Sequence, residues 1–372
     1  MYMKRYFVDA EQFICHRRQL YYTRRALECG KMTVGILGGS ISEPIDTPWK
    51  EKRWPDKLTN WLVSSFPEVT VNVENAAKGA TGSESALFRV EQDILSRNCD
   101  IVFVEYAVND KDMPSKERKL CREGLIRKLL GYEKREFDVV VVYTYYGGML
   151  QDMLNGTLYE GVAEFEEICK HYSITSVNMG AYAFAQLQAG NVRYEEWLPD
   201  KVHAGDVGSR LYAESVMCLI EDACETAEKM DYEMPEPLFI EHWGKAHKLN
   251  HDMIRRMGPW KCVRCYRIPT VERILQTTAI GAALEFEFEG TGLVLFVRIN
   301  GYAAGYRIQV DDGQWNEVIG PRPEWCYQTP DWIRSDMLYG FSRGQHHVRL
   351  ETIMIPDAAG SHFELCDIGI IP

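Results

Sequence analysis

The pattern of apolar and polar positions changes near residue 231. Before that point, short runs of apolar, often β-branched residues alternate with longer segments whose apolar residues recur at helical spacing. The runs predict strands at residues 33–37, 69–75, 101–106, 139–144 and 174–178. The segments predict helices at residues 10–29, 56–66, 83–97, 115–130, 161–171, 181–187 and 207–230. Strict alternation of strands and helices predicts an α/β domain, with a parallel sheet covered on both faces.

Beyond that point the chain is expected to form a different kind of domain. Residues 231–243 (DYEMPEPLFIEHW) contain two prolines and several acids, which indicates a linker or crossing segment. Apolar and polar residues then alternate between turn signals, predicting strands at residues 284–289, 292–299, 306–310, 346–353 and 363–370. We therefore expect a small antiparallel β-sandwich. The predicted parts are the α/β domain (1–230), the linker (231–260) and the sandwich (261–372).

Composition narrows the class of protein. A chain of 372 residues is too long for one ordinary core, so two domains are expected. No uninterrupted apolar stretch reaches the roughly 18 residues of a membrane helix, and the N-terminus lacks a basic-then-apolar secretion signal, so we expect a cytoplasmic protein. The 11 scattered cysteines indicate reduced thiols. A formal charge of -12 argues against nucleic acid as a partner.

Two short stretches carry candidate chemistry. Residues 35–42 read GILGGSIS, so an apolar strand runs into two glycines and Ser40. We expect Ser40 to be exposed at the carboxyl end of this strand, where open α/β sheets bind ligands. Far downstream, Asp200 and His203 lie three residues apart in the motif DKVH, close enough to share one loop turn. A serine, a base and an orienting acid together form a nucleophilic site, although each motif alone is common.

Hydrogen-bond donors for a developing oxyanion are also available. After the second predicted strand, residues 75–83 read NAAKGATGS, where Gly79 can present its backbone N–H. After the third, residues 105–110 read EYAVND, where the side-chain amide of Asn109 can reach the same oxygen. The alternatives are a helix-entry glycine and an N-cap or turn residue.

These four stretches, in this order and each after a strand, resemble the blocks of the SGNH (GDSL-type) hydrolase superfamily. The serine block matches GGSIS at Ser40, the glycine block Gly79, the asparagine block AVND at Asn109, and the last block DKVH at Asp200 and His203. The resemblance covers about residues 33–230.

The chain departs from the usual family pattern at two positions without losing a catalytic group. Gly39 stands where the family usually has Asp, and Ala107 where it usually has Gly. A shifted alignment would also place Gly82, rather than Gly79, in the glycine block.

The resemblance implies a three-layer, flavodoxin-like fold and an ester hydrolase without metal or organic cofactor. It implies an acyl-enzyme on Ser40, proton transfer by His203, and an oxyanion held by Ser40 N–H, Gly79 N–H and the Asn109 amide. An SGNH domain followed by a β-sandwich resembles carbohydrate esterase family 17, active on O-acetylated mannan. The implied partner is an acetylated manno-oligosaccharide, with the acetyl group on the mannose 2-hydroxyl. Whether the chain forms a homo-oligomer is left open.

Aromatic residues supply candidate contacts to sugar. Residues 320–334 (GPRPEWCYQTPDWIR) are too proline-rich for a central strand and contain Trp325, Tyr327 and Trp332. Aromatic faces commonly line ligand sites, so these residues and Trp49 are predicted to bind substrate. The alternative is that these aromatics pack between the domains or, for Trp49, beneath the first helix.

Two other functions are retained. The first is an SGNH enzyme acting on other acyl groups, such as a lysophospholipase, thioesterase or acyltransferase, which a deep apolar pocket beside Ser40 would favour. The second is a sugar-binding protein whose triad is idle, which predicts binding that is indifferent to Ser40→Ala. A single CxxC at Cys262 and Cys265, without a second pair, predicts no metal site.

Overall fold

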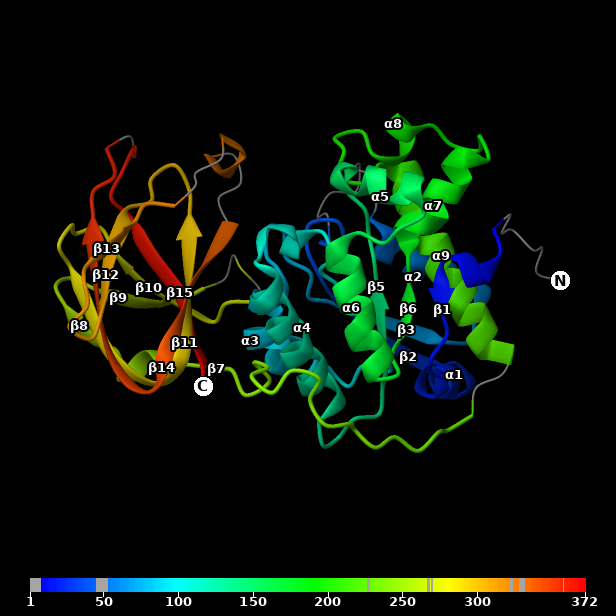
Figure 1. Cartoon of the computed structure of the whole chain (residues 1–372), viewed down its shortest axis with the longest axis horizontal. Coiled ribbons are helices and arrows are strands. Elements are labelled where there is room, and N and C mark those ends of the chain that lie inside the picture. The colour runs from blue at the N-terminus through cyan, green and yellow to red at the C-terminus, as the bar shows by residue number, and fades with distance from the viewer. Residues whose placement is uncertain are drawn as a thin grey trace. The chain divides into compact units, whose positions relative to one another are not determined.

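The computed structural model describes residues 8–44, 53–225, 228–265, 268, 270–320, 324–327, 332–356 and 358–372. Two compact units divide the chain, Met1–Gly244 and Lys245–Pro372 (Figure 1). The division falls inside the predicted linker, because residues 245–260 contribute strands to the second unit. In the described part of the chain, no helix is long and apolar enough to cross a membrane.

The first unit is built on a sheet whose strands, as far as the described residues go, follow the order β1-β6-β5-β4-β2-β3. The parallel strands are β2 (Lys31–Gly38), β3 (Thr70–Asn75), β4 (Ile101–Glu105), β5 (Asp138–Val142) and β6 (Thr175–Val177). All of the predicted strands of this domain are therefore confirmed. Every residue of β4 and β5 is buried, which explains why these strands read as continuous apolar runs.

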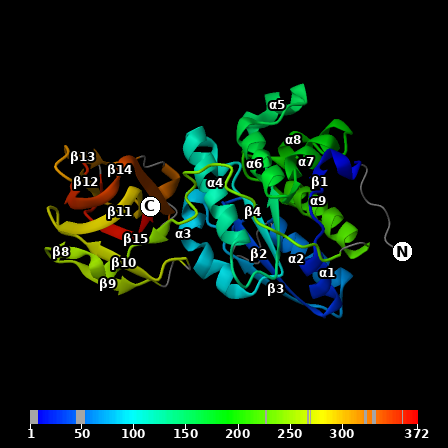
Figure 2. The same ribbon diagram turned by 60° about the horizontal axis from the view of Figure 1, so that its bottom comes forward.

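Helices cover both faces of this sheet and make the predicted three layers. The longer ones are α1 (Tyr21–Glu28), α2 (Trp54–Ser65), α3 (Ser83–Asp93), α4 (Ser115–Leu130), α6 (Glu160–His171), α7 (Met179–Gln188) and α9 (Asp206–Glu225). Shorter ones are α5 (Leu150–Asn155) and α8 (Tyr194–Trp197). Helices α3, α4 and α6 lie on one face, and α1, α2, α7 and α9 on the other (Figures 1 and 2).

The strand order places a switch point beside β2. The chain goes from β2 outward to β3 and then returns across β2 to β4. In doubly wound sheets, ligands bind outside the carboxyl ends of the strands at such a reversal. Ser40 follows directly after β2, so the topology puts it at this point.

The predicted first helix at residues 10–29 is wrong over its first half. A short 3₁₀ helix (Ala10–Gln12) is followed by β1 (Ile14–Cys15), and only then does α1 begin. Ile14 is buried and pairs antiparallel with Val177 of β6, and the backbone N–H of Arg17 donates to Thr175 Oγ1 at 3.2 Å. Tertiary pairing with the open sheet edge thus overrides the local helical pattern.

The segment before Gly244 is tied to α4 rather than free. The backbone N–H groups of Leu238 and Phe239 donate to the Glu123 carboxylate at 2.6 and 2.7 Å. Further along, the N–H of Trp243 donates to the carbonyl of Leu120 at 3.1 Å. These bonds make the segment part of the first unit, so the linker predicted over residues 231–260 is replaced by a boundary at Gly244.

The second unit is an antiparallel sheet, as predicted. Its strands are β7 (His247–Lys248), β8 (Arg255–Met257), β9 (Lys261–Arg264), β10 (Arg273–Thr277), β11 (Ala283–Ile299), β12 (Gly305–Val310), β13 (Asn316–Val318), β14 (Trp332–Ile353) and β15 (Phe363–Ile371). Within the described residues the order is β13-β12-β14-β11-β15-β10-β9, with β7 on β15 and β8 on β11.

A bulge lets one long strand serve a single core. Two strands were predicted at residues 284–289 and 292–299, but both belong to β11, whose register shifts between Gly290 and Gly292. Even positions face the core before the shift and odd positions after it: Leu284, Phe286 and Phe288, then Leu293, Leu295, Val297 and Ile299. An inserted residue moves the alternation by one and bends the strand, so both halves face the same cluster.

All eleven cysteines are free thiols. Cys262 lies exposed in β9, and Cys265 follows the strand. Among the described residues, no three His, Cys, Asp or Glu side chains are grouped so that they could hold a metal ion.

Candidate active site

A tight turn after β2 presents Ser40. The backbone N–H groups of Ser42 and Glu43 both donate to the carbonyl of Gly39, at 3.1 and 3.0 Å. This turn reverses the chain directly behind the serine and leaves Ser40 partly exposed. The asparagine that ends β3, Asn75, donates its amide to Ser42 O at 2.9 Å and fixes the far side of the turn.

The three residues predicted to form a nucleophilic site make one hydrogen-bonded chain. Ser40 Oγ lies 2.8 Å from His203 Nε2, and His203 Nδ1 lies 2.7 Å from Asp200 Oδ2. The other oxygen, Asp200 Oδ1, accepts the backbone N–H groups of Val202 and His203 at 2.9 and 2.6 Å. Asp200 therefore holds both the ring and the backbone of the histidine.

The electrostatics of this chain suit a base. Burial opposes ionisation of Asp200, but the hydrogen bonds from His203 and Val202 outweigh it and lower the pKa of this carboxyl below its usual value. An ionised carboxylate only accepts hydrogen bonds, so Nδ1 of His203 carries the ring proton. In the neutral imidazole, Nε2 is then the acceptor for the Ser40 hydroxyl, which is the arrangement that activates an alcohol.

Both predicted donor loops reach the serine turn. A Cβ atom added to Gly79 would lie 3.5 Å from Ser40 Cβ, and one added to Gly39 would lie 2.0 Å from Asn109 Oδ1. A Cβ atom on Gly82, the N-cap of α3, would instead meet Glu84 Oε2 at 2.3 Å and Asp110 Oδ1 at 2.5 Å. Of the two candidate glycines, Gly79 is thus the one beside Ser40.

The two departures from the SGNH pattern lie in the turn after β2 and in the loop after β4. Any side chain at position 39 would collide with Asn109. The glycine found there therefore lets the Asn109 side chain pack against the serine turn. Ala107, in the loop that follows β4, is fully buried.

A buried glutamate beneath the turn was missed by the sequence analysis. Glu105, the last residue of β4, accepts hydrogen bonds from Ser42 Oγ at 3.0 Å, Gly39 N–H at 3.4 Å and Thr144 Oγ1 at 2.6 Å. Trp54 Nε1 donates to Ser42 Oγ at 2.8 Å from the other side. Burial among these neutral donors raises the pKa of Glu105 to about 7. The signal for Glu105 in the sequence was an acidic residue at the end of a continuous apolar run.

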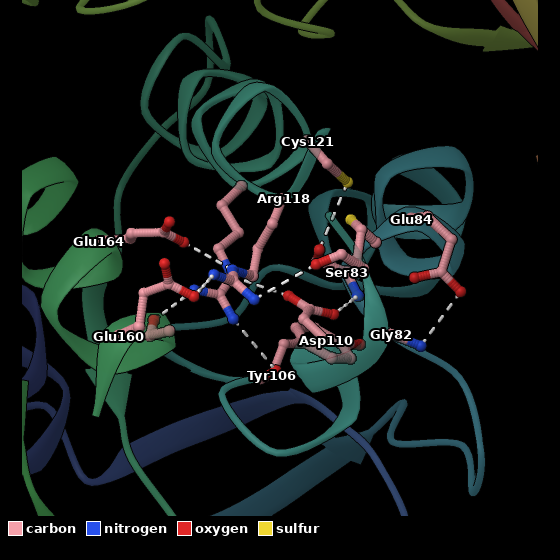
Figure 3. A network of polar contacts seen from close by, with 12 residues as sticks. Gly82, Ser83, Glu84, Tyr106, Asp110, Arg118, Cys121, Glu160 and Glu164 are labelled. Carbon is pink, nitrogen blue, oxygen red and sulfur yellow. Dashed lines mark hydrogen bonds and ion pairs between the residues drawn. The ribbon is translucent and has the colours of Figure 1, made fainter. Parts of the chain in front are cut away.

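A second group that the sequence analysis missed connects the two predicted donor loops by hydrogen bonds. Asp110, next to Asn109, accepts the backbone N–H of Ser83 at 2.8 Å (Figure 3). It also accepts Arg122 Nε at 2.7 Å. Asp110 and Arg122 are both fully buried, and Arg122 also donates to Gly161 O. Because Ser83 begins α3 directly after the Gly79 loop, the aspartate joins that loop to the Asn109 loop. The sequence shows only that charged residues are spread through the segment that forms α4, and it does not show which of them are buried.

The structure describes only one of the side chains that were predicted to bind sugar. Trp49, and the side chains of Trp325 and Tyr327, lie outside its described parts. Trp332 is 9% exposed and belongs to the apolar core of the second unit, together with Tyr306. This burial gives Trp332 a packing role in that core, and its contact with sugar stays a prediction.

Solved structures match the chain over almost its whole length, whereas no family model and no curated protein matches it. One is a two-domain esterase (CEX) active on acetylated mannans, co-crystallized with mannopentaose, with a TM-score of 0.81, 21% identity and 98% of each chain covered. A second structure of such an esterase gives a TM-score of 0.82 at 20% identity, covering 97% of this chain and 98% of that one. The predicted two-domain fold is therefore confirmed.

We predict that Gly39→Ala lowers kcat for a small aryl acetate by about 10²-fold, the loss typical for one oxyanion donor. The added methyl group would displace the Asn109 amide, which it meets at 2.0 Å. Gly344→Ala is a matched control, because a Cβ atom there meets nothing within 4 Å. Steady-state kinetics of both variants test this, and near-normal kcat in Gly39→Ala would show that the Asn109 position is not critical.

We predict that Glu105 makes stability depend on pH. Its pKa is raised from 4.5 to about 7, so the folded state keeps a proton that the unfolded chain releases between these values. The free energy of unfolding of wild type relative to Glu105→Gln should therefore fall by about 3 kcal/mol as pH rises through this window, and then level off. Urea unfolding at pH 5 and pH 8 measures the difference. An equal difference at both pH values would contradict the prediction.

Proposed function

We propose that this protein is a serine esterase that removes O-acetyl groups from carbohydrate, with acetylated manno-oligosaccharides as its substrates. The observation that carries the proposal is the hydrogen-bonded chain Ser40–His203–Asp200 at the carboxyl end of β2. Gly79 and Asn109 beside that serine support it, because acyl transfer needs donors for the oxyanion as well as a nucleophile.

The reaction follows from these positions. Ser40 Oγ attacks the acetyl carbonyl while its proton passes to His203 Nε2, and Asp200 stabilises the imidazolium that forms. The negative oxygen accepts hydrogen bonds from Ser40 N–H, Gly79 N–H and the Asn109 amide, each typically worth about 2.7 to 4 kcal/mol. His203 then gives its proton to the departing sugar oxygen. Water, activated by the same histidine, releases acetate from the acyl-enzyme.

The substrate class rests on the two-domain architecture. An esterase with the same α/β and antiparallel domains is described as active on acetylated mannans, and its crystals contained mannopentaose. With the resemblance to carbohydrate esterase family 17, this likeness supports a mannan-derived substrate. We place the cleaved acetyl group on the 2-hydroxyl of mannose.

The proposal predicts acetate release from acetylated manno-oligosaccharides, and little from acetylated xylo-oligosaccharides assayed in parallel. Ser40→Ala should reduce the rate by about 10⁴-fold or more, because the nucleophile is removed while the fold is kept. An enzyme-coupled acetate assay gives both rates, with circular dichroism as the check on folding.

Other outcomes identify the part of the proposal that is wrong. If a short aryl ester is cleaved in a Ser40-dependent way while neither sugar releases acetate, the mechanism stands and the carbohydrate class is wrong. If sugar binds equally to wild type and Ser40→Ala and no ester is cleaved, the chain is a binding protein.

A further inference from the structure

A glutamate already occupies one of the expected oxyanion donors. Glu43 lies three residues after Ser40, and the turn at Gly39 brings its side chain back to the Gly79 loop. Glu43 Oε2 accepts the backbone N–H of Gly79 at 3.0 Å, and Oε1 accepts Lys78 Nζ at 2.9 Å. The N–H that the proposed mechanism assigns to the oxyanion thus donates to a carboxylate in this structure.

This carboxylate and the nucleophile lie on the same side of one glycine. A Cβ atom added to Gly79 would be 2.5 Å from Glu43 Oε2 and 3.5 Å from Ser40 Cβ. A carboxylate that stayed in this position would compete for the donor and repel the negative charge that develops on the acyl oxygen. Glu43 must therefore give up its bond to Gly79 before the ester can react.

The surroundings allow this exchange. The Glu43 side chain is 31% exposed and that of Lys78 is 18% exposed, so the carboxylate can turn toward solvent while its cation stays close. A carboxylate has only acceptor sites, and one that loses a donor inside a site needs another. A hydroxyl group of the substrate beside the ester is such a donor. Water is an alternative donor, but it loses freedom when it is held in the site, whereas the substrate hydroxyl is already fixed by binding.

We propose that Glu43 is a specificity-determining residue that exchanges the Gly79 N–H for a free hydroxyl of the substrate. The site then selects acetyl esters of polyhydroxylated alcohols over esters of the same size without hydroxyl groups. This inference rests on the proposed function, because it presupposes that Ser40 cleaves acetyl esters. It goes further in naming the chemical feature that admits a substrate.

A matched pair of small esters tests the inference without assuming any particular sugar. Glycerol monoacetate and propyl acetate share a three-carbon alcohol, and only the first carries free hydroxyl groups. Wild type should show the higher kcat/KM for glycerol monoacetate. In Glu43→Gln and Glu43→Ala this preference should shrink by about tenfold or more, the range expected for a hydrogen bond to a charged group.

The direction of each change matters as much as the ratio. In both Glu43 variants, kcat/KM should fall for glycerol monoacetate, because the hydroxyl loses its charged acceptor in Glu43→Gln and its acceptor altogether in Glu43→Ala. The value should rise for propyl acetate, which no longer has to displace a carboxylate. Glu68→Gln is the control, since it removes the same charge from an exposed position before β3, at the opposite end of that strand from the site. It should leave both values unchanged.

Each contrary result has a distinct meaning. Equal changes for the two esters in the Glu43 variants would overturn the inference and give Glu43 a purely structural role. Values that stay unchanged for both esters would also overturn it, and would show that Glu43 has no effect on the reaction. If Ser40→Ala hydrolyses both esters as fast as wild type, the proposed function itself is wrong. Glu43→Gln retains the shape of the side chain, so it provides the answer if Glu43→Ala does not fold.

Discussion

The buried ion pair between Asp110 and Arg122 is the contact on which the geometry of the site depends most. Asp110 connects the loop that carries Asn109 to the first N–H of α3, which follows the Gly79 loop. Both partners are fully buried, and removing one such partner typically costs about 3–5 kcal/mol because the other charge is left uncompensated. The spacing of the two donor loops is therefore fixed by an interaction that is costly to break.

Three carboxylates around Ser40 serve different purposes because their surroundings differ. Asp200 is hydrogen-bonded by His203 and has a lowered pKa, which suits a group that stabilises a cation. Glu105 lies below the turn, where burial raises its pKa to about 7 and its oxygens hold Gly39 and Ser42 in place. Glu43 forms an ion pair with Lys78, and its side chain is partly exposed to solvent. Carboxylate side chains thus supply a hydrogen-bond partner that orients His203, a structural support and, by our inference, a selector for hydroxyl groups.

Local signals in the sequence predicted the parallel strands, because buried strands read as apolar runs. They also predicted the pair Asp200 and His203, because these residues lie only three positions apart. Ser40 and His203 are distant in sequence, and their pairing was predicted from the resemblance to the SGNH motifs. Pairings to which those motifs assign no role were missed. Glu43 bonds to Gly79 and Asp110 to Arg122, and neither pairing follows from spacing alone. The helix predicted over residues 10–29 was wrong at its start, because β1 forms by pairing with the edge of β6, and that edge exists only after folding.

The central claim is that Ser40 is a nucleophile activated by His203, and covalent labelling tests it most directly. A serine-reactive fluorophosphonate should add one adduct per chain, on the peptide that contains Ser40 when the digest is read by mass spectrometry. The adduct should form far more slowly in His203→Ala, where the base is missing, and not at all in Ser40→Ala. A wild-type protein that remains unlabelled, or that is labelled at a different serine, would contradict the account.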